Sequence, residues 1–321
     1  MRQAVRRLAA LACGVALVCT TGTASAAPCL GNPNALGVSR VLSVSARHTP
    51  LIGTHDYGMT LPLADGEVVL TFDDGPRPPY TNHVLKALAD ECVQAVFFMV
   101  GRQANAHPDM VRQIHAAGHT VGTHTQSHPL HRMSPFRAIW EIENGIASVG
   151  AALGPRPMAP FFRFPGLFRT SEAESHLRAR GIMAWSVDVD SYDWKRIGPN
   201  AMLQHTLAAL DARRGGILLM HDVQPKTALM LPALLAELKS RGYRIVHVVP
   251  SAGERIPLPE LVARSGTSPR VRPPLTEVNA RASREVTGTI RRPPPPAQHP
   301  WDGPIKPGPF GAIFAPDPFR W

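Results

Sequence analysis

Strand-like and helix-like segments alternate regularly along the middle of this 321-residue chain, between residues 67 and 249. The candidate strands are short apolar runs at residues 68–72, 95–100, 120–122, 161–164, 182–187, 216–220 and 244–249. Candidate helices follow six of them, at residues 81–91, 108–117, 135–153, 171–180, 199–213 and 229–241. Strands joined through helices pair in parallel by right-handed crossovers. The pattern therefore predicts an α/β fold with a parallel sheet.

Polar residues at the ends of these strands help to choose between an open sheet and a closed barrel. Those at or just after a strand's carboxyl end are Asp73, Asp74, His124, Arg163, Asp190 and His221. An open doubly wound sheet gathers its functional groups at one switch point. A barrel presents groups from many strands on one face. We therefore expect a (β/α) barrel with seven strands.

The first 27 residues have the features of a secretory signal peptide. Arg2, Arg6 and Arg7 precede an apolar run at residues 8–19, and the small residues 24–26 form a cleavage site. A membrane-spanning helix needs roughly 20 apolar residues, so this run is short for an anchor. We expect export to the periplasm or the medium with no transmembrane span after cleavage; an uncleaved anchor is the alternative.

Two further segments flank the predicted barrel, which we place at residues 65–250. Residues 28–64 form an N-terminal extension that includes a strand-like stretch at 40–45. Residues 251–321 hold 15 of the 33 prolines and are basic, so we expect a disordered tail. The net charge of +10 does not indicate a nucleic-acid partner, because the chain has no nucleic-acid-binding motif and is expected to be exported. Nothing in the sequence indicates an oligomeric state.

The cysteines offer one disulfide in the mature chain. Cys13 and Cys19 leave with the signal peptide, so only Cys29 and Cys92 remain. An oxidising compartment favours a bridge between the two. The alternative is a buried Cys92 and a free Cys29.

Adjacent carboxylates follow the first predicted strand. The side chains of Asp73 and Asp74 leave the chain in different directions, so one can bind a metal ion while the other acts as a base on water. An ordinary Asp-Gly turn that closes a strand is the structural alternative.

A histidine pair follows the third predicted strand. His124 and His128 are four residues apart, and on a helical turn this spacing aims both imidazoles at one ion. Together with Asp74 they make a set of two histidines and one carboxylate. No glutamate follows His124, which disfavours a zinc peptidase. A surface pair without a ligand is the alternative.

Arg163 emerges from an apolar strand, and a buried arginine needs a carboxylate partner. Asp73 is the natural partner, although a structural ion pair elsewhere would also satisfy it. His221 ends another buried strand and can protonate a departing amine if a carboxylate raises its pKa. Asp190 or Asp193 can serve as that carboxylate; a core histidine is the alternative.

Five segments carry this chemistry. They are residues 71–75 (Thr-Phe-Asp-Asp-Gly), 124–129 (His-Thr-Gln-Ser-His-Pro), 162–166 (Phe-Arg-Phe-Pro-Gly), 190–194 (Asp-Ser-Tyr-Asp-Trp) and 218–221 (Leu-Leu-Met-His). In this order they resemble the NodB homology domain of the polysaccharide deacetylases, carbohydrate esterase family 4. The resemblance implies a distorted (β/α) barrel and a hydrolase that removes N-acetyl groups from N-acetylhexosamine polymers or oligosaccharides.

The resemblance also implies a role for each site residue. Asp73 would be the general base, Arg163 would position it, and His221 would be the acid, tuned by Asp193 or Asp190. Asp74, His124 and His128 would bind a divalent metal, zinc first, with cobalt, manganese or nickel as alternatives. The residues expected to contact the substrate are Gly166, Trp194 and Leu219.

One position departs from the family pattern. The family usually has an aromatic residue between the proline and glycine of the third segment, whereas Gly166 follows Pro165 directly here. This puts the oxyanion donor at that position in question. A carbohydrate-binding protein on a degenerate scaffold is the rival hypothesis. A glycosidase with two acids is disfavoured, since adjacent Asp73 and Asp74 beside a histidine pair suit metal chemistry better.

Overall fold

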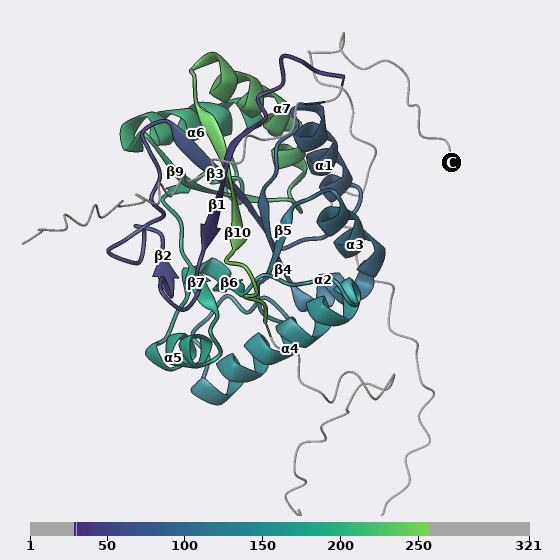
Figure 1. The fold of residues 1–321 in the computed structure, drawn as a ribbon, viewed down its shortest axis with the longest axis vertical. Coiled ribbons are helices and arrows are strands. Elements are labelled where there is room, and N and C mark those ends of the chain that lie inside the picture. The colour runs from purple at the N-terminus through teal and green to yellow at the C-terminus, as the bar shows by residue number, and fades with distance from the viewer. Residues whose placement is uncertain (1–28, 30, 257–321) are drawn as a thin grey trace, which may run out of the picture. The chain divides into compact units, whose positions relative to one another are not determined.

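The sheet is parallel throughout and its helices lie outside it (Figure 1). The structure is a computed structural model that describes residue 29 and residues 31–256. The strands are β1 (Val38–Val44), β2 (Leu51–Ile52), β3 (Glu67–Asp73), β4 (Val96–Met99), β5 (Thr120–Thr123), β6 (Phe161–Arg163), β7 (Met183–Trp185), β8 (Val189–Asp190), β9 (Gly215–His221) and β10 (Arg244–Pro250). The helices are α1 (Tyr80–Asp90), α2 (Gly101–Ala106), α3 (Pro108–Ala116), α4 (Pro135–Leu153), α5 (Ser171–Ala179), α6 (Pro199–Arg213) and α7 (Pro225–Ser240), with a 3-10 turn at Pro165–Leu167.

The predicted α/β fold with a distorted barrel is confirmed. The seven predicted strands are β3, β4, β5, β6, β7, β9 and β10, and each predicted helix has its counterpart. The sheet runs in the order β1-β10-β3-β4-β5-β6-β7-β2, with β9 pairing on the other side of β3 and β8 pairing with β9. The predicted N-terminal extension contributes β1 and β2 to this same sheet.

Side chains that point alternately to the two faces of the sheet form two apolar cores. On β3, Val68, Leu70 and Phe72 belong to the core between sheet and helices, whereas Val69 belongs to the core enclosed by the sheet. Because successive side chains point to opposite faces, Thr71 and Asp73 share the inner face with Val69. The sequence of β3 therefore carries a carboxylate inward at the strand's last residue.

The buried side chain of Asp188 helps to close the ring between β2 and β9. One carboxylate oxygen accepts hydrogen bonds from the Thr54 backbone N–H and hydroxyl, at 2.8 and 2.7 Å. The other accepts from the Thr60 hydroxyl at 2.6 Å and the Ile217 N–H at 2.9 Å. Glycine is required beside it, because a Cβ on Gly53 (φ 104°) would lie 2.4 Å from the Ser186 carbonyl carbon. The Asp188 side chain thus links the segment that follows β2 to strand β9, in addition to the backbone hydrogen bonds there.

Helix α4 is bounded by ordinary capping signals. The Ser134 hydroxyl accepts a hydrogen bond from the Arg137 N–H at 3.4 Å, and Pro135 occupies the first turn, where no N–H is needed. Gly154, with φ 66°, ends the helix. Its buried face carries Ala138, Ile142 and further small or apolar residues. This face packs against the outer core and places α4 beside the loop that follows β5.

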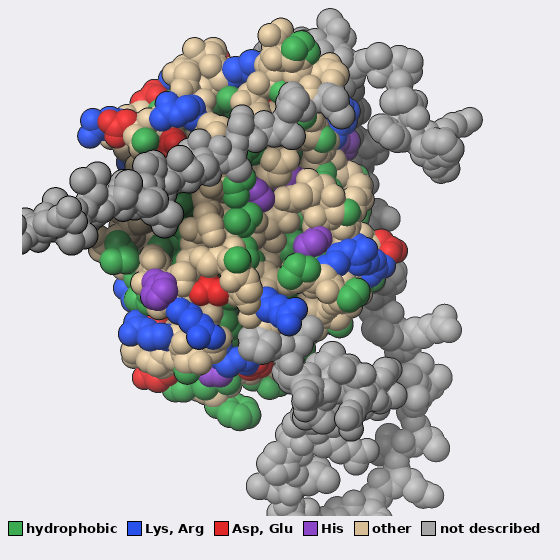
Figure 2. All heavy atoms as spheres, viewed as in Figure 1, with side chains coloured by type: hydrophobic (Ala, Val, Ile, Leu, Met, Phe, Trp, Pro, Cys, Tyr) green, Lys and Arg blue, Asp and Glu red, His purple; other side chains and the backbone are tan. Residues whose placement is uncertain are grey.

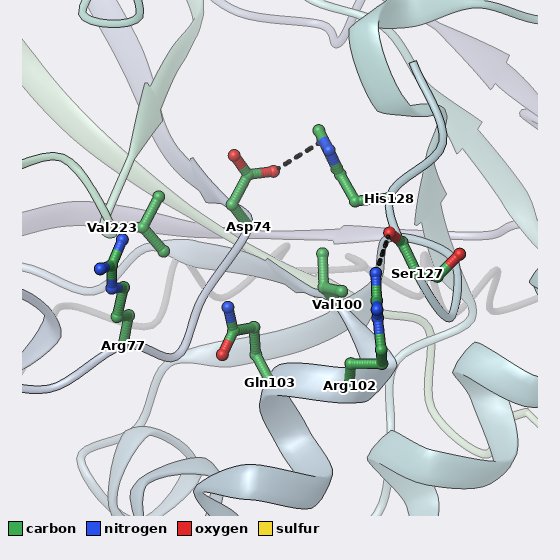
Figure 3. Close-up of a pocket in the computed structure, with 8 residues that line it drawn as sticks. All are labelled: Asp74, Arg77, Val100, Arg102, Gln103, Ser127, His128 and Val223. Carbon is green, nitrogen blue, oxygen red and sulfur yellow. Dashed lines mark hydrogen bonds and ion pairs between the residues drawn. The ribbon is translucent and has the colours of Figure 1, made fainter. Parts of the chain in front are cut away.

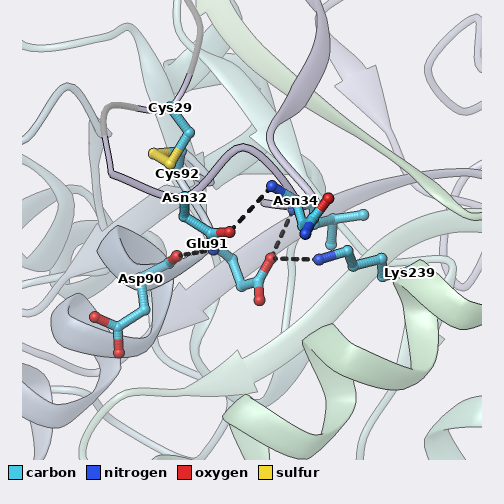
Figure 4. The surroundings of a disulfide bond; sticks show 8 residues. Cys29, Asn32, Asn34, Asp90, Glu91, Cys92 and Lys239 are labelled. Atoms are coloured by element: carbon cyan, nitrogen blue, oxygen red, sulfur yellow. Dashed lines mark hydrogen bonds and ion pairs between the residues drawn. A yellow bond between two sulfur atoms is a disulfide. The ribbon is translucent and has the colours of Figure 1, made fainter.

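Both ends of the described chain are held to the domain. Cys29 and Cys92, the pair expected to form a disulfide, are joined with a Cα–Cα distance of 5.7 Å (Figure 4). At the other end, the Glu254 carboxylate accepts hydrogen bonds from the Ser45 hydroxyl at 2.7 Å and the Ala46 N–H at 2.8 Å. Ile256 is buried. Residues 251–256, placed in the tail by the sequence, therefore contact the domain.

The predicted signal peptide and the rest of the predicted tail lie outside the described residues. Among the described helices, none combines the length and apolar character needed to cross a bilayer. On the face shown in Figure 2, lysine and arginine side chains gather in several separate small groups.

Candidate active site

Parallel strands bring the predicted site residues to one edge of the barrel. Asp73 ends β3, Arg163 ends β6 and His221 ends β9, while His124 directly follows β5. In the sheet register Asp73 lies beside His221. Because the carboxyl ends of parallel strands meet at one edge, residues far apart in sequence converge there.

Asp74, His124 and His128 form a group able to hold a metal ion. One donor atom from each lies within 4.8 Å of the other two. The Asp74 Oδ1 atom is 2.9 Å from His128 Nε2 and 3.4 Å from His124 Nε2. This Oδ1 is buried and yet has no hydrogen-bond partner among the described residues. Lone pairs that converge without hydrogen bonds are what a cation site requires, so the three residues fit a divalent ion.

The orientation of His124 supports the same conclusion. Its Nδ1 donates a hydrogen bond to the Arg163 carbonyl at 2.7 Å, which leaves the Nε2 lone pair free to face Asp74. Burial by itself would raise the pKa of Asp74, but the adjacent His124 and His128 hold it well below its usual range. An ionised carboxylate is the form that binds metal.

The histidine pair does not lie on a helix, contrary to the geometry expected from its spacing. Residues 124–128 form a loop, with Thr125 at φ 64° and His128 at φ 59°. Asp74, at φ 77°, also has left-handed backbone. Such conformations are unfavourable for residues other than glycine and recur at functional sites. The loop geometry, rather than a helical repeat, brings the two imidazoles together.

Glu141 holds this loop in place and was not recognised from the sequence. Its fully buried carboxylate accepts hydrogen bonds from the N–H groups of Gln126 and Ser127, at 3.0 and 2.8 Å. It also accepts from the Ser127 hydroxyl and from Arg137, both at 2.6 Å. The available signal was an acidic residue within the apolar face of the predicted helix 135–153, beside Ile142.

Arg163 and Asp73 form a buried ion pair. The Arg163 Nη1 atom is 2.7 Å from Asp73 Oδ1 and donates to the Thr71 hydroxyl at 2.8 Å. The guanidinium also lies over the Phe98 ring, 4.3 Å from its centroid. The second oxygen of Asp73 is 3.7 Å from His124 Nε2. Arg163 thus fixes one carboxylate oxygen and leaves the other facing the metal-binding group.

His221 is paired with Asp193 and not with Asp190. Its Nδ1 lies 2.6 Å from Asp193 Oδ1, and its backbone N–H donates to Asp193 Oδ2 at 2.6 Å. Burial lowers the pKa of His221, but the Asp193 carboxylate outweighs this effect and raises it to about 10. The Asp190 carboxylate instead accepts from the Tyr192 N–H at 2.8 Å and the Trp194 indole N–H at 3.1 Å. Asp190 therefore shapes the loop that carries Trp194.

The three predicted substrate contacts differ in accessibility. Trp194 is 54% exposed, whereas Leu219 is only 5% exposed and lies on β9 opposite Asp190 in the register. Gly166 is exposed, with φ 56°, and a Cβ there would come within 2.9 Å of the Phe168 ring. Trp194 and Gly166 are open to a ligand, while Leu219 lies beneath the surface.

A cleft of about 290 Å³ opens over Asp74 and His128 (Figure 3). The residues that line it are Asp74, Arg77, Val100, Arg102, Gln103, Ser127, His128 and Val223. Its size is at the lower end of the range usual for small-molecule sites. The two arginines were not recognised from the sequence.

Comparison with known proteins agrees with the fold. A family model described as polysaccharide deacetylase matches residues 61–185. A chitooligosaccharide deacetylase from Rhizobium leguminosarum bv. trifolii is 33% identical over 196 residues, which are 56% of this chain and 89% of the relative. A peptidoglycan-N-acetylglucosamine deacetylase from Bacillus cereus is 32% identical over 187 residues, 56% of this chain and 85% of the relative. The chain belongs to the polysaccharide deacetylase family, carbohydrate esterase family 4.

Solved structures show the same relationship. A peptidoglycan deacetylase from Bdellovibrio bacteriovorus superposes with a TM-score of 0.60 at 28% identity, covering 66% of this chain and 59% of that one. A carbohydrate esterase family 4 pseudoenzyme from Bacillus anthracis gives a TM-score of 0.51 at 24% identity, covering 57% of this chain and 64% of that one. The latter likeness concerns the fold alone, so the residues of the site have to carry the functional argument.

Proposed function

We propose that this protein is a metal-dependent hydrolase that removes N-acetyl groups from N-acetylhexosamine-containing polysaccharides or oligosaccharides and releases acetate. The observation that carries the proposal is the convergence of a buried carboxylate, a three-residue cation group and a protonatable histidine on one barrel edge. Amide hydrolysis needs a base for water, an acid for the amine and stabilisation of an oxyanion.

The proposed roles follow from the contacts. Asp73, oriented by Arg163, accepts the proton of the attacking water through its free oxygen. His221, held by Asp193, donates a proton to the departing amine, for which its raised pKa suits it. The acyl group leaves as acetate, and the sugar keeps a free amine. A divalent ion on Asp74, His124 and His128 would supply Lewis-acid activation of the acetamide carbonyl and of water.

Zinc is the first candidate for this ion, with cobalt, manganese and nickel as alternatives. Imidazole nitrogens and a carboxylate suit zinc, and three protein ligands leave a position open, as catalytic zinc sites do. The donor set suits the other three ions as well, so the proposal names zinc by preference rather than by exclusion.

A degenerate, purely binding protein on the same scaffold is the rival. The chain keeps the proposed base Asp73, the proposed acid His221 and all three residues of the cation group, and this favours an enzyme. We further propose that the protein acts outside the cytoplasm, in the periplasm or medium. This localisation rests on the signal-like residues 1–27.

Acetate release from an N-acetylglucosamine oligomer and from peptidoglycan glycan strands tests the proposal. We expect acetate from at least one of them, loss of activity with a chelator, and recovery on adding zinc. Absence of acetate from every N-acetylated substrate would support the binding protein. If the chelator left the rate of acetate release unchanged, the proposed metal dependence would be wrong.

A further inference from the structure

Two arginines flank the metal-binding residues in the cleft. Arg77 comes from the loop between β3 and α1, and Arg102 from the first turn of α2. Figure 3 shows them on either side of Gln103, with Asp74 and His128 above. Both side chains belong to exposed residues. Apart from Asp74, the lining of the cleft has no acidic residue, so its formal charge is positive.

Neither guanidinium forms an ion pair with any residue in the described part of the chain. Arg102 donates one hydrogen bond, to the Ser127 carbonyl at 3.0 Å. Arg77 makes a looser contact, with its guanidinium carbon 5.8 Å from the centre of the Tyr80 ring. A guanidinium has five N–H donors in a planar fork that matches a carboxylate. Most of this donor capacity therefore remains free for a ligand.

The backbone at both arginines is held in place. The Arg77 N–H donates to the Thr81 hydroxyl at 2.7 Å, and that hydroxyl donates to the buried Asp222 carboxylate at 2.5 Å. The Arg102 N–H donates to the Gln126 carbonyl at 2.9 Å, in the same loop as His128. A fixed backbone lowers the ordering cost of binding, so two free cations are presented beside the reactive centre.

We propose that Arg77 and Arg102 form a carboxylate-binding subsite, and that the preferred substrate is an N-acetylated glycan with carboxylate groups on sugars next to the one that is deacetylated. The inference rests on the proposed function and narrows its substrate class. The arginines lie apart, on separate elements, which suits repeated carboxylates along a glycan better than one compact phosphate. Neutral N-acetylglucosamine oligomers would leave both cations without a partner.

A matched pair of substrates tests the subsite. Strands that alternate N-acetylglucosamine and N-acetylmuramic acid are compared with the same strands after methyl esterification of their carboxylates. We expect the wild-type protein to release acetate from the free-acid strands with a kcat/KM about tenfold higher or more, because charge-assisted pairs are strong and specific. The advantage should shrink as salt is raised.

Variants separate recognition from structure. Arg77→Gln combined with Arg102→Gln should lower kcat/KM on the free-acid strands about tenfold or more and so remove most of the preference for the free acid over the ester. Arg214→Gln is the control, because Arg214 is an exposed arginine immediately before β9, at the end opposite His221, with only an exposed pair to Asp65. It should behave as wild type on both substrates.

Each outcome bears on a different claim. Equal rates on acid and ester by the wild type, or an equal loss on both in the double variant, would overturn the subsite and leave the deacetylase proposal standing. No acetate from either strand or from a neutral N-acetylglucosamine oligomer would reject the deacetylase proposal. Calorimetric binding of both strands then decides the subsite: tighter binding of the free acid that the double variant loses would support it, and equal binding would overturn it.

Discussion

Asp73 is the residue on which the proposed reaction depends most, because one of its oxygens is already committed to Arg163. Asp73→Asn keeps the size of the side chain and removes its ability to take a proton. We expect kcat to fall by about 10²-fold or more, in line with the loss of a general base, while bound metal is retained. Kinetics together with metal analysis of the same sample check this. A variant that turns over at nearly the wild-type rate would exclude Asp73 as the base.

The metal assignment predicts that replacing either of two histidines in one loop has a very different effect on the amount of bound zinc. His128→Ala removes one of three ligands and should reduce bound zinc to near background. His131→Ala, three residues further on, changes an exposed histidine outside the metal-binding group and should leave zinc at the wild-type level. Elemental analysis after dialysis gives the answer. Full occupancy in His128→Ala would contradict the assignment.

Glu141 should affect metal binding without touching the metal. The Glu141 carboxylate accepts four hydrogen bonds, whereas the amide of Glu141→Gln has only one acceptor oxygen. The loop that carries His128 should therefore be held less firmly in this variant. Groups that orient ligands typically change metal affinity about 10–100-fold, and we expect weaker zinc binding in this range. Titration of the metal-free protein against a competing chelator measures it.

The control for that experiment is Glu143→Gln on the same helix. Glu143 pairs with His176 and Arg180, away from the loop, so its loss should leave the zinc affinity unchanged. If both variants weakened zinc binding equally, a general loss of stability would explain the effect and Glu141 would have no positioning role.

The site could be predicted in part because its chemistry lies in short segments. Two adjacent carboxylates, Asp73 and Asp74, and two histidines four residues apart, His124 and His128, already indicate metal-assisted chemistry in the sequence. The choice of Asp193 over Asp190 was beyond the sequence, because it depends on how the loop after β8 turns back toward β9. Glu141 was missed because it holds a loop that belongs to an earlier segment of the chain. Arg77 and Arg102 were missed because only the folded structure shows that they line one cleft.

At the scale of elements, two histidines are buried: His247 on β10 and His119, the residue immediately before β5. His247 Nε2 lies 2.9 Å from the Thr120 hydroxyl, and the His119 Nδ1 accepts from the Ala95 N–H at 3.2 Å. Burial lowers the pKa of His247 from 6.5 to about 4. Burial, with a smaller contribution from His247, lowers the pKa of His119 to about 3. Both histidines are therefore neutral in the folded protein at neutral pH.

These histidines predict a loss of stability in acid. The unfolded chain takes up protons on them near pH 6.5, whereas the folded chain does so only near pH 4 or below. The stabilisation is thus present above pH 6.5 and is lost as the pH falls toward these values. His247→Gln keeps an N–H donor for Thr120 but cannot titrate. Between pH 7 and pH 5 the wild type should lose about 2 kcal/mol more than this variant in denaturant unfolding. If both proteins lost the same unfolding free energy, protonation of His247 would not be a cause of the instability in acid.

The elements that the sequence predicted are those with strong local periodicity. The seven apolar strands and the six longer helices were all visible in this way. Strands β2 and β8 have two residues each, so their pairing with β7 and β9 defines them rather than any pattern of their own. The short helix α2 likewise follows β4 without a distinct amphipathic repeat. Tertiary pairing, which local patterns do not encode, accounts for these omissions.

At the scale of the whole molecule, the last described residues predict where the chain can be shortened. A protein ending after residue 256 keeps the contacts of Glu254 and the burial of Ile256, so its thermal midpoint and its activity on a small substrate should match the full chain. A protein ending after Ser251 loses both and should unfold at a lower temperature. Calorimetry on the two proteins tests this. Equal midpoints would show that residues 252–256 add nothing to stability.

The pairing of β1 with β10 has a consequence for how the molecule forms. Val38 lies opposite Ile245 in the register, so the first described strand finds its partner more than 200 residues later in the chain. Contacts of such long separation slow folding, because a large loop must close before they are made. During synthesis β1 has to wait unpaired until nearly the whole barrel has been produced. Strand β1 is therefore among the last parts of the described domain to become native, and it stays accessible to a chaperone or protease until β10 has been made.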